Sequence, residues 1–186
     1  MARLVGISGS LRKGSFNTAL LHAAAEVAPS GTTIVVETLH GVPLYDADLE
    51  AADGIPEAVA RLKAAIVDAD GLLLVTPEYN NGIPGVFKNA IDWMSRPSTD
   101  IAKVFGALPV AVTGASPGGF GTILSQNAWL PVLRTLGTNP WFGGRLLVSG
   151  AGKLFENGTL ADETTRGRLA DFVAGFAAFA EANSRL

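Results

Sequence analysis

The sequence predicts an α/β protein in which a parallel sheet is covered by helices on both faces. Short apolar runs alternate along the chain with longer segments whose apolar residues recur at helical spacing. The short runs are continuously apolar rather than alternating, as expected of strands that are buried on both faces. Parallel strands need a helical crossover between them, and the spacing of the runs leaves room for one each time.

Five strands are expected, each followed by a helix. The strands are Arg3–Ile7, Thr33–Val36, Leu72–Val75, Leu108–Val112 and Arg145–Val148. The helices begin near Ser15 or Phe16, at Pro56, at Pro84, after Gly121 and ahead of Leu169. Pro56 is assigned to the first turn of its helix, where proline has no hydrogen-bonded N–H to lose. No repeat or linker divides residues 1–186, so a single domain is expected.

Composition and charge argue against several classes of function. The net charge of −3 argues against a nucleic-acid or membrane-surface partner, and no apolar run approaches the roughly 18 to 20 residues of a membrane span. Without cysteine there is no thiolate metal site or cysteine nucleophile. The two histidines, His22 and His40, are far apart in sequence, which argues against a metal centre. With no signal-like segment ahead of the first strand, we expect a cytoplasmic protein.

The loop after the first strand has the parts of a phosphate site. Ser8–Asn17 combines glycine, serine and two cations ahead of a helix, whose first N–H groups and dipole favour an anion. Arg12 can bind phosphate oxygens with two N–H groups at once. The order Lys13-Gly14-Ser15 is not that of a P-loop, and the glycine spacing is not that of a dinucleotide fingerprint. An ordinary strand-to-helix turn remains the alternative.

Two further loops follow strands that end at the same sheet edge. Thr76–Gly85 carries two prolines and two glycines, which fix an unusual path, and its Tyr79 can lie along a planar ring. Gly114-Ala115-Ser116-Pro117-Gly118 matches the G-x-S-x-G pattern of a hydrolase. Against that reading, Pro117 lacks the N–H that would serve an oxyanion hole, and both histidines precede the serine. A glycine-rich wall for a flat ligand is the better interpretation.

Taken together, these loops resemble the NAD(P)H-dependent FMN reductase family. The likeness is carried by Gly9–Asn17, by Thr76–Asn80 and by Lys88–Trp93, and Pro43–Asp48 also looks like that group. It runs over essentially the whole chain and is nearest to soluble bacterial quinone and chromate reductases. The resemblance implies a flavodoxin-like three-layer sandwich, with a five-stranded parallel sheet in the order 2-1-3-4-5, that holds FMN without a covalent link.

The resemblance also implies which residues hold the cofactor. Those for the phosphate and ribityl end would be Ser10, Arg12, Ser15, Phe16 and Asn17. Those lining the isoalloxazine ring, largely through backbone, would be Pro77, Glu78, Tyr79 and Asn80, with Thr113 and Gly114 touching it from the third loop. No metal and no catalytic side chain is expected, because the flavin carries the chemistry.

The implied activity is a ping-pong transfer of electrons from NADPH or NADH, through FMN, to a quinone, free flavin or chromate-type metal ion. The family likeness also implies a homodimer, possibly a tetramer, with the helix that carries Trp93 at the contact. Two alternatives stay open. One is a flavodoxin-type electron carrier without NAD(P)H turnover, although such carriers tend to be much more acidic than −3. The other is an interaction module without flavin on the same scaffold.

Overall fold

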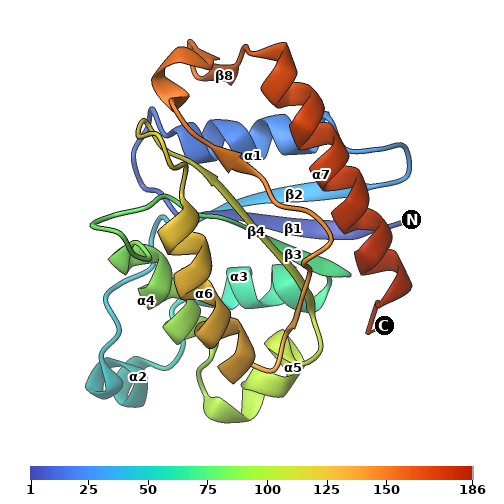
Figure 1. The fold of residues 1–186 in the computed structure, drawn as a ribbon. Helices are drawn as coiled ribbons and strands as arrows, with labels where there is room; N and C mark the ends of the chain where they lie inside the picture. The colour runs from blue at the N-terminus through green and yellow to red at the C-terminus, as the bar shows by residue number, and fades with distance from the viewer. Residues whose placement is uncertain (186) are drawn as a thin grey trace.

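The computed structural model describes residues 1–185 and has a parallel sheet at its centre (Figure 1). Its strands are β1 (Arg3–Ser8), β2 (Thr33–Thr38), β3 (Gly71–Val75), β4 (Pro109–Ala115), β5 (Asn139–Pro140) and β6 (Leu147–Val148). The strand order is β2-β1-β3-β4-β5, with β6 also paired to β4. Every pair in this sheet is parallel. The expected order 2-1-3-4-5 is therefore confirmed.

Helices cover both faces of the sheet, as expected (Figure 1). They are α1 (Phe16–Glu26), α2 (Ala47–Asp53), α3 (Glu57–Val67), α4 (Gly85–Met94), α5 (Ile101–Phe105), α6 (Ile123–Thr135) and α7 (Glu163–Ala182). Helices α1 and α7 pack on one face, while α3, α4, α5 and α6 pack on the other. Both termini lie at the end of the sheet opposite the loops that follow β1, β3 and β4 (Figure 1).

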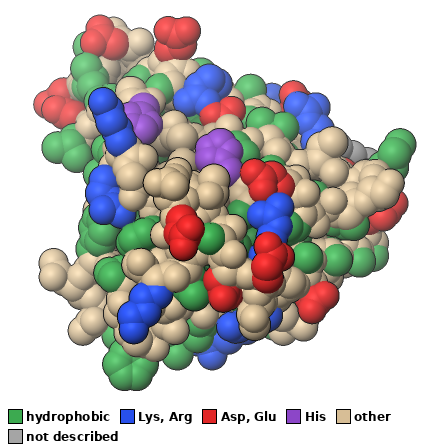
Figure 2. Space-filling view, turned by 90° about the horizontal axis from the view of Figure 1, so that it is seen from above, with side chains coloured by type: hydrophobic (Ala, Val, Ile, Leu, Met, Phe, Trp, Pro, Cys, Tyr) green, Lys and Arg blue, Asp and Glu red, His purple; other side chains and the backbone are tan. Residues whose placement is uncertain are grey.

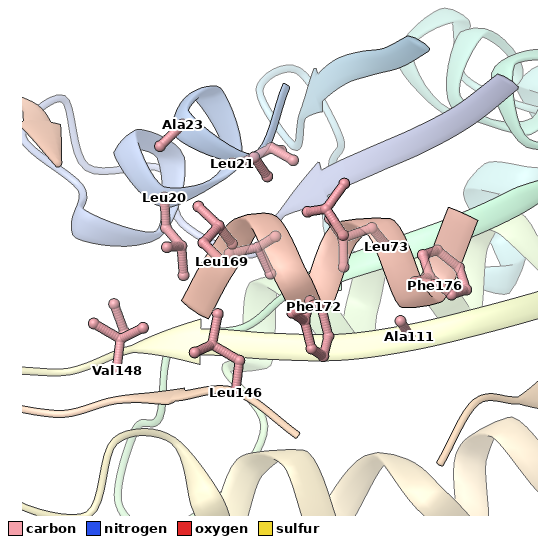
Figure 3. Packing of buried hydrophobic residues seen from close by; sticks show 14 of the residues in the cluster. Leu20, Leu21, Ala23, Leu73, Ala111, Leu146, Val148, Leu169, Phe172 and Phe176 are labelled. Carbon is pink, nitrogen blue, oxygen red and sulfur yellow. The ribbon is translucent and has the colours of Figure 1, made fainter. Parts of the chain in front are cut away.

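Two apolar clusters, one on each face, hold the layers together. One cluster, shown in Figure 3, includes Leu20 and Leu21 of α1, Phe172 and Phe176 of α7, and Leu73 of β3. The cluster on the opposite face is centred on the buried rings of α4 and α6. Because β1 and β3 are buried along both faces, their sequences are continuously apolar, which is the pattern that predicted them.

The fifth strand differs from the expected Arg145–Val148. Its place is divided between β5, which pairs with the start of β4, and β6, which pairs with the end of β4. The chain between them leaves the sheet after Trp141, whose N–H still donates to the carbonyl of Val110 at 2.8 Å and whose ring packs against Phe172 and Phe176 of α7. A Cβ on Gly143 would lie 2.4 Å from Nε1 of Trp141, so the detour depends on that glycine. Only the last two residues of the expected strand pair with β4.

Several short elements were not expected. Helix α2 has no buried residue, so it leaves no apolar pattern in the sequence. Helix α5 and a hairpin of β7 (Phe155–Glu156) and β8 (Thr159–Leu160) are also additional. Pro56 is the N-cap of α3 rather than a first-turn residue. Strand β4 runs on to Ala115, so the third loop begins later than predicted.

No helix within residues 1–185 combines the length and apolar character needed to cross a membrane.

Candidate functional site

A cavity of about 260 Å³ lies at the carboxyl ends of the central strands. This is the edge at which ligands of open parallel sheets bind, because the loops after neighbouring strands converge there. The cavity is lined by residues of three loops, namely Ser10, Arg12, Ser15, Phe16, Asn17, Pro77, Glu78, Tyr79, Ala115, Ser116 and Pro117. The structure therefore brings together eight of the eleven residues that the sequence indicated; the other three are Asn80, Thr113 and Gly114.

The first loop ends at the N-terminus of α1, and the dipole of a helix favours an anion at this end. Ser15 is the N-cap of α1, and its hydroxyl oxygen accepts a hydrogen bond from the N–H of Thr18 at 3.3 Å. The N–H groups of Phe16 and Asn17, in the first turn, have no intrahelical acceptor. The hydroxyl oxygen of Ser10 accepts from the N–H of Arg12 at 3.3 Å, which shapes the loop. Loop hydroxyls, first-turn N–H groups and a cation therefore converge on the same space.

Arg12 is placed by an aromatic ring rather than by a carboxylate. Its guanidinium carbon lies 5.2 Å from the centroid of the Phe16 ring, within cation–π range. Within residues 1–185, no acidic side chain forms an ion pair with Arg12. Its charge is consequently available to an anion in the cavity.

Asn17 has a role that the sequence did not reveal. Its Nδ2 donates to the carbonyl of Ala115 at 2.9 Å, and its Oδ1 accepts from the N–H of Ala115 at 2.8 Å. The side chain is only 4% exposed. The Asn17 side chain joins the start of α1 to the end of β4. The group of Asn17 that is left to bind an anion is therefore its backbone N–H.

The second loop is anchored to α6 by Glu78. The Glu78 Oε2 accepts hydrogen bonds from the N–H groups of Leu124 and Ser125, at 2.8 and 3.0 Å. Helix α6 has no side-chain cap at its own N-cap, Thr122, so Glu78 supplies the missing acceptor. Glu78 thus lines the cavity while its carboxylate caps α6.

A buried hydroxyl strengthens the same connection. Thr76 Oγ1 donates to the carbonyl of Pro77 at 2.9 Å and lies 2.9 Å from Ser125 Oγ. It also accepts from Nε1 of Trp129 at 3.2 Å. The start of the loop is therefore held by two side chains of α6.

The tip of the second loop is a two-residue hairpin. Tyr79 and Gly82 exchange backbone hydrogen bonds of 3.2 and 3.0 Å, and Asn80 and Asn81 between them both have positive φ. Asparagine tolerates this left-handed backbone better than most residues, as a type I′ turn requires. Asn80 stands outside the cavity lining, whereas Tyr79, 51% exposed, forms part of its wall.

The third loop contributes later residues than expected. Thr113 is buried in β4, where its hydroxyl donates to the carbonyl of Leu146 at 3.0 Å. A Cβ on Gly114 would lie 2.0 Å from the carbonyl oxygen of Thr76, so this glycine permits the close contact with the second loop. The cavity wall is made instead by Ala115, Ser116 and Pro117. A predicted fourth strand that ran on to Ala115, as β4 does, would have pointed to these three residues.

The geometry does not support a serine hydrolase. Ser116 Oγ donates to the carbonyl of Gly121 at 2.6 Å, and the next residue is the proline that lacks an N–H. His22 and His40 are both exposed, and Figure 2 shows the two histidines apart on the surface among interspersed charges of both signs. No cluster of metal-binding side chains occurs in the described part of the chain.

Two motifs that lie far apart in the sequence meet beside this edge. The side chain of Asn89 accepts from the N–H of Tyr45 at 2.8 Å and donates to the carbonyl of Pro43 at 2.8 Å. Trp93 Nε1 donates to the same carbonyl at 3.0 Å, and its ring meets the Tyr45 ring edge to face. Trp93 is completely buried within the chain. The expectation that Trp93 contacts a second subunit is therefore wrong, because it packs under the 43–46 segment.

An ionic cluster holds α2 against the end of α4. Arg96 Nε binds Glu50 Oε2 at 2.9 Å, and the Tyr45 hydroxyl donates to the same oxygen at 3.0 Å. The hydrogen bond from Arg96 is the main cause that lowers the pKa of the Glu50 carboxyl. The hydrogen bond to Glu50 likewise raises the pKa of Tyr45.

Comparison with known proteins identifies the family. The family model described as NADPH-dependent FMN reductase matches residues 2–153. An NAD(P)H-dependent FMN reductase of Pseudomonas aeruginosa is 42% identical over 165 residues, covering 88% of this chain and 87% of that protein. A 2-hydroxy-1,4-benzoquinone reductase of a Burkholderia species is 38% identical over 178 residues, covering 95% of each.

Solved structures agree as well. The flavoenzyme NAD(P)H:(acceptor) oxidoreductase FerB of Paracoccus denitrificans has a TM-score of 0.87 and 32% identity, over 99% of this chain and 100% of that one. A flavodoxin, WrbA-like protein of Agrobacterium tumefaciens, at 17% identity and a TM-score of 0.60, covers 99% of this chain and 100% of that one and shares the fold. The family match, the sequence relatives and the cavity agree: the chain belongs to the NADPH-dependent FMN reductase family of flavin-dependent oxidoreductases.

Proposed function

We propose that this chain binds FMN without a covalent link in the three-loop cavity and passes electrons from NAD(P)H to a quinone, a free flavin or a similar acceptor. The observation that carries the proposal is the anion site at the start of α1. There a serine cap, first-turn N–H groups and the Arg12 charge, which has no acidic partner among the described residues, face one cavity.

The residues present fit the cofactor. A phosphate dianion suits the N-terminus of α1 together with Arg12, Ser10 and Ser15. The one carboxylate in the lining, Glu78, is turned to the N-terminus of α6 by two hydrogen bonds, which limits its repulsion of a phosphate. Backbone of the Pro77–Tyr79 segment and of the Ala115–Pro117 segment forms the walls against which a planar ring would rest.

FMN, when bound, supplies the hydride and electron transfer. The protein's own residues then bind the cofactor, orient its ring and stabilise its charge. Arg12 and the α1 terminus hold the charged end, and the Tyr79–Gly82 hairpin, fastened to α6 through Glu78 and Thr76, keeps the ring wall rigid. Backbone N–H groups of these loops would stabilise negative charge on the ring. No side chain is assigned the role of acid or base.

NAD(P)H and the acceptor are proposed to use the same open side of the cavity in turn, which makes the kinetics ping-pong. A quinone is the acceptor best supported, since relatives from Burkholderia and Pseudomonas putida are named benzoquinone and quinone reductases. Chromate-type metal ions are proposed as further acceptors at the same open site.

Residues 1–186 are proposed to act as one FMN-binding domain in the cytoplasm and as a homodimer, with a tetramer as the larger alternative. Exposed apolar side chains on and beside α6 support self-association; they are Phe120, Leu124, Leu130 and Phe142. Light scattering on the FMN-loaded protein measures the assembly, and a mass of one chain would contradict a dimer.

The first test is an absorbance spectrum of the purified protein with FMN, followed by NADPH without oxygen. Bound-flavin bands that bleach with NADPH, and recover when a quinone is added, are the expected result. Bound flavin that NADPH and NADH both fail to bleach would favour the flavodoxin-type carrier. Failure to bind FMN would contradict the proposal and leave the interaction module.

A further inference from the structure

We infer that Phe155, in the β7–β8 hairpin, is a positioning residue for the phosphate end of the cofactor and acts through Phe16 on Arg12. The inference rests on the proposed FMN site. It concerns a residue beyond 2–153, the range that the family model matches, and none of the three cavity-lining loops contains it.

Three side chains form a continuous column at the mouth of the site. The Arg12 guanidinium lies 5.2 Å from the centroid of the Phe16 ring. The Phe16 and Phe155 ring centroids are 5.4 Å apart, with a tilt of 43° between the rings. The column runs from an exposed cation, through a half-buried ring, to a ring that is 9% exposed. Each member is therefore better fixed than the one before it.

Phe155 is the fixed end because its hairpin is held by the body of the protein. Strand β7 pairs with β8 across a tight turn in which Asn157 and Gly158 both have positive φ. Beyond the hairpin, the N–H groups of Ala161 and Asp162 both donate to the carbonyl of Leu154, and Asp162 then caps α7. Phe155 itself belongs to the apolar cluster of α1 and α7.

Arg12 needs such support, since within residues 1–185 no ion pair and no side-chain hydrogen bond restrains its guanidinium. A free arginine side chain loses much rotamer freedom when it binds a phosphate. A guanidinium already resting on an aromatic face loses less, and its N–H edge stays available to an anion. Phe155 keeps Phe16 in the position that makes this possible.

The test compares FMN with riboflavin, which lacks the phosphate, by titrating each into the apoprotein of the full chain. Phe155→Leu is expected to weaken FMN binding about two- to fivefold, the size of an exposed cation–π contact, and to leave riboflavin binding unchanged. Phe155→Tyr keeps the ring and should restore FMN binding. Phe16→Leu removes the ring that touches Arg12 directly and should give at least the same selective loss of FMN affinity. This variant provides the test if Phe155→Leu folds poorly.

A double-mutant cycle separates positioning from general packing. In an Arg12→Ala background, Phe155→Leu should cause no further loss of FMN affinity, because the group that it positions is already absent. Phe172→Leu is the matched control: it removes a ring of the same apolar cluster on α7 and should not change the ratio of FMN to riboflavin affinity.

The outcomes are distinct. Equal weakening of both flavins, or additive losses in the cycle, would overturn the role of Phe155 while leaving the FMN site intact. If Arg12→Ala itself does not distinguish FMN from riboflavin, the phosphate assignment fails and the inference fails with it. A selective and non-additive loss of FMN affinity supports both.

Discussion

At the scale of single residues, two polar side chains that line the cavity have defined hydrogen-bond partners. Glu78 is turned to a helix terminus and Asn17 to the backbone of Ala115, so neither side chain competes with Arg12 for the cavity. Without these two arrangements, a carboxylate and an amide would share the space proposed for a phosphate. The proposed binding of an anion thus depends on side chains that are hydrogen-bonded to protein groups.

The first prediction concerns the phosphate contacts. Replacing Arg12 and Ser15 together by alanine should reduce the binding free energy of FMN by at least ~2 kcal/mol, because charge-assisted hydrogen bonds to the phosphate are lost. Calorimetric titration of the apoprotein measures this change. Arg134→Ala, an exposed arginine in the last turn of α6, is the control and should bind FMN normally. Unchanged FMN affinity in the double variant would refute the phosphate assignment.

At the scale of elements, the second loop and α6 form one unit. Glu78 provides the capping acceptor that α6 lacks, so removing it acts on both the helix and the loop. We expect Glu78→Ala to lower the free energy of unfolding by about 1 kcal/mol and also to weaken FMN binding. Glu78→Gln keeps one acceptor oxygen and should show a smaller effect on both. Urea unfolding and FMN titration measure the two quantities.

Asp46→Ala offers a matched control for this prediction. Asp46 caps α2 by accepting from the N–H of Asp48 at 2.9 Å, and it lies outside the cavity lining. Its loss should remove a helix cap without weakening FMN binding. If Glu78→Ala leaves FMN affinity as intact as Asp46→Ala does, the second loop does not depend on its contact with α6.

Helix α2 should respond to pH. The Arg96 hydrogen bond lowers the pKa of Glu50 in the folded protein, so the ionised carboxylate stabilises the attachment of α2 above the unfolded pKa of about 4.5. This stabilisation is lost as the pH falls from there through the lowered folded pKa. Amide exchange of residues 47–53 should therefore increase in acid relative to the rest of the chain. In Glu50→Gln the exchange should already be fast at neutral pH, and a wild-type pH response in that variant would exclude Glu50 as the cause.

At the scale of the whole molecule, Arg185 connects the segment after α7 to two helices on the other face of the sheet. Arg185 donates to the carbonyls of Ile66, Lys103 and Gly106, at the carboxyl ends of α3 and α5. Cations are stabilising at helix carboxyl ends, so this contact joins the last residues to two helices across the molecule. Arg185→Ala should lower the free energy of unfolding by about 1 to 3 kcal/mol. Arg168→Ala, an exposed arginine of α7, should cost far less in the same urea titration.

Local sequence patterns predicted the layers and the three loops, because buried strands and helix starts leave such patterns. The strand order was predicted from the family resemblance that the loop motifs carry. The sequence could not predict what depends on distant partners. Asn17 binds Ala115, which is 98 positions away, and position 114 of β4 needs a glycine because the carbonyl oxygen of Thr76 lies against it. The ring of Trp141 packs against α7 at the point where the chain leaves the sheet, and a run of apolar residues in the sequence does not show this contact. The column of Arg12, Phe16 and Phe155 likewise joins two loops that only the tertiary fold brings together.

The interrupted fifth strand has a consequence for how copies of this chain can meet. An intact outer strand exposes a row of unpaired backbone groups onto which another strand can add. Here that edge is broken into two-residue pieces, β5 and β6, with the chain looping outward between them. Neither β5 nor β6 exposes more than two residues of strand to which another strand could pair. This edge of the sheet therefore resists the addition of a strand from a second copy, and the proposed self-association would use side-chain surfaces such as that of α6.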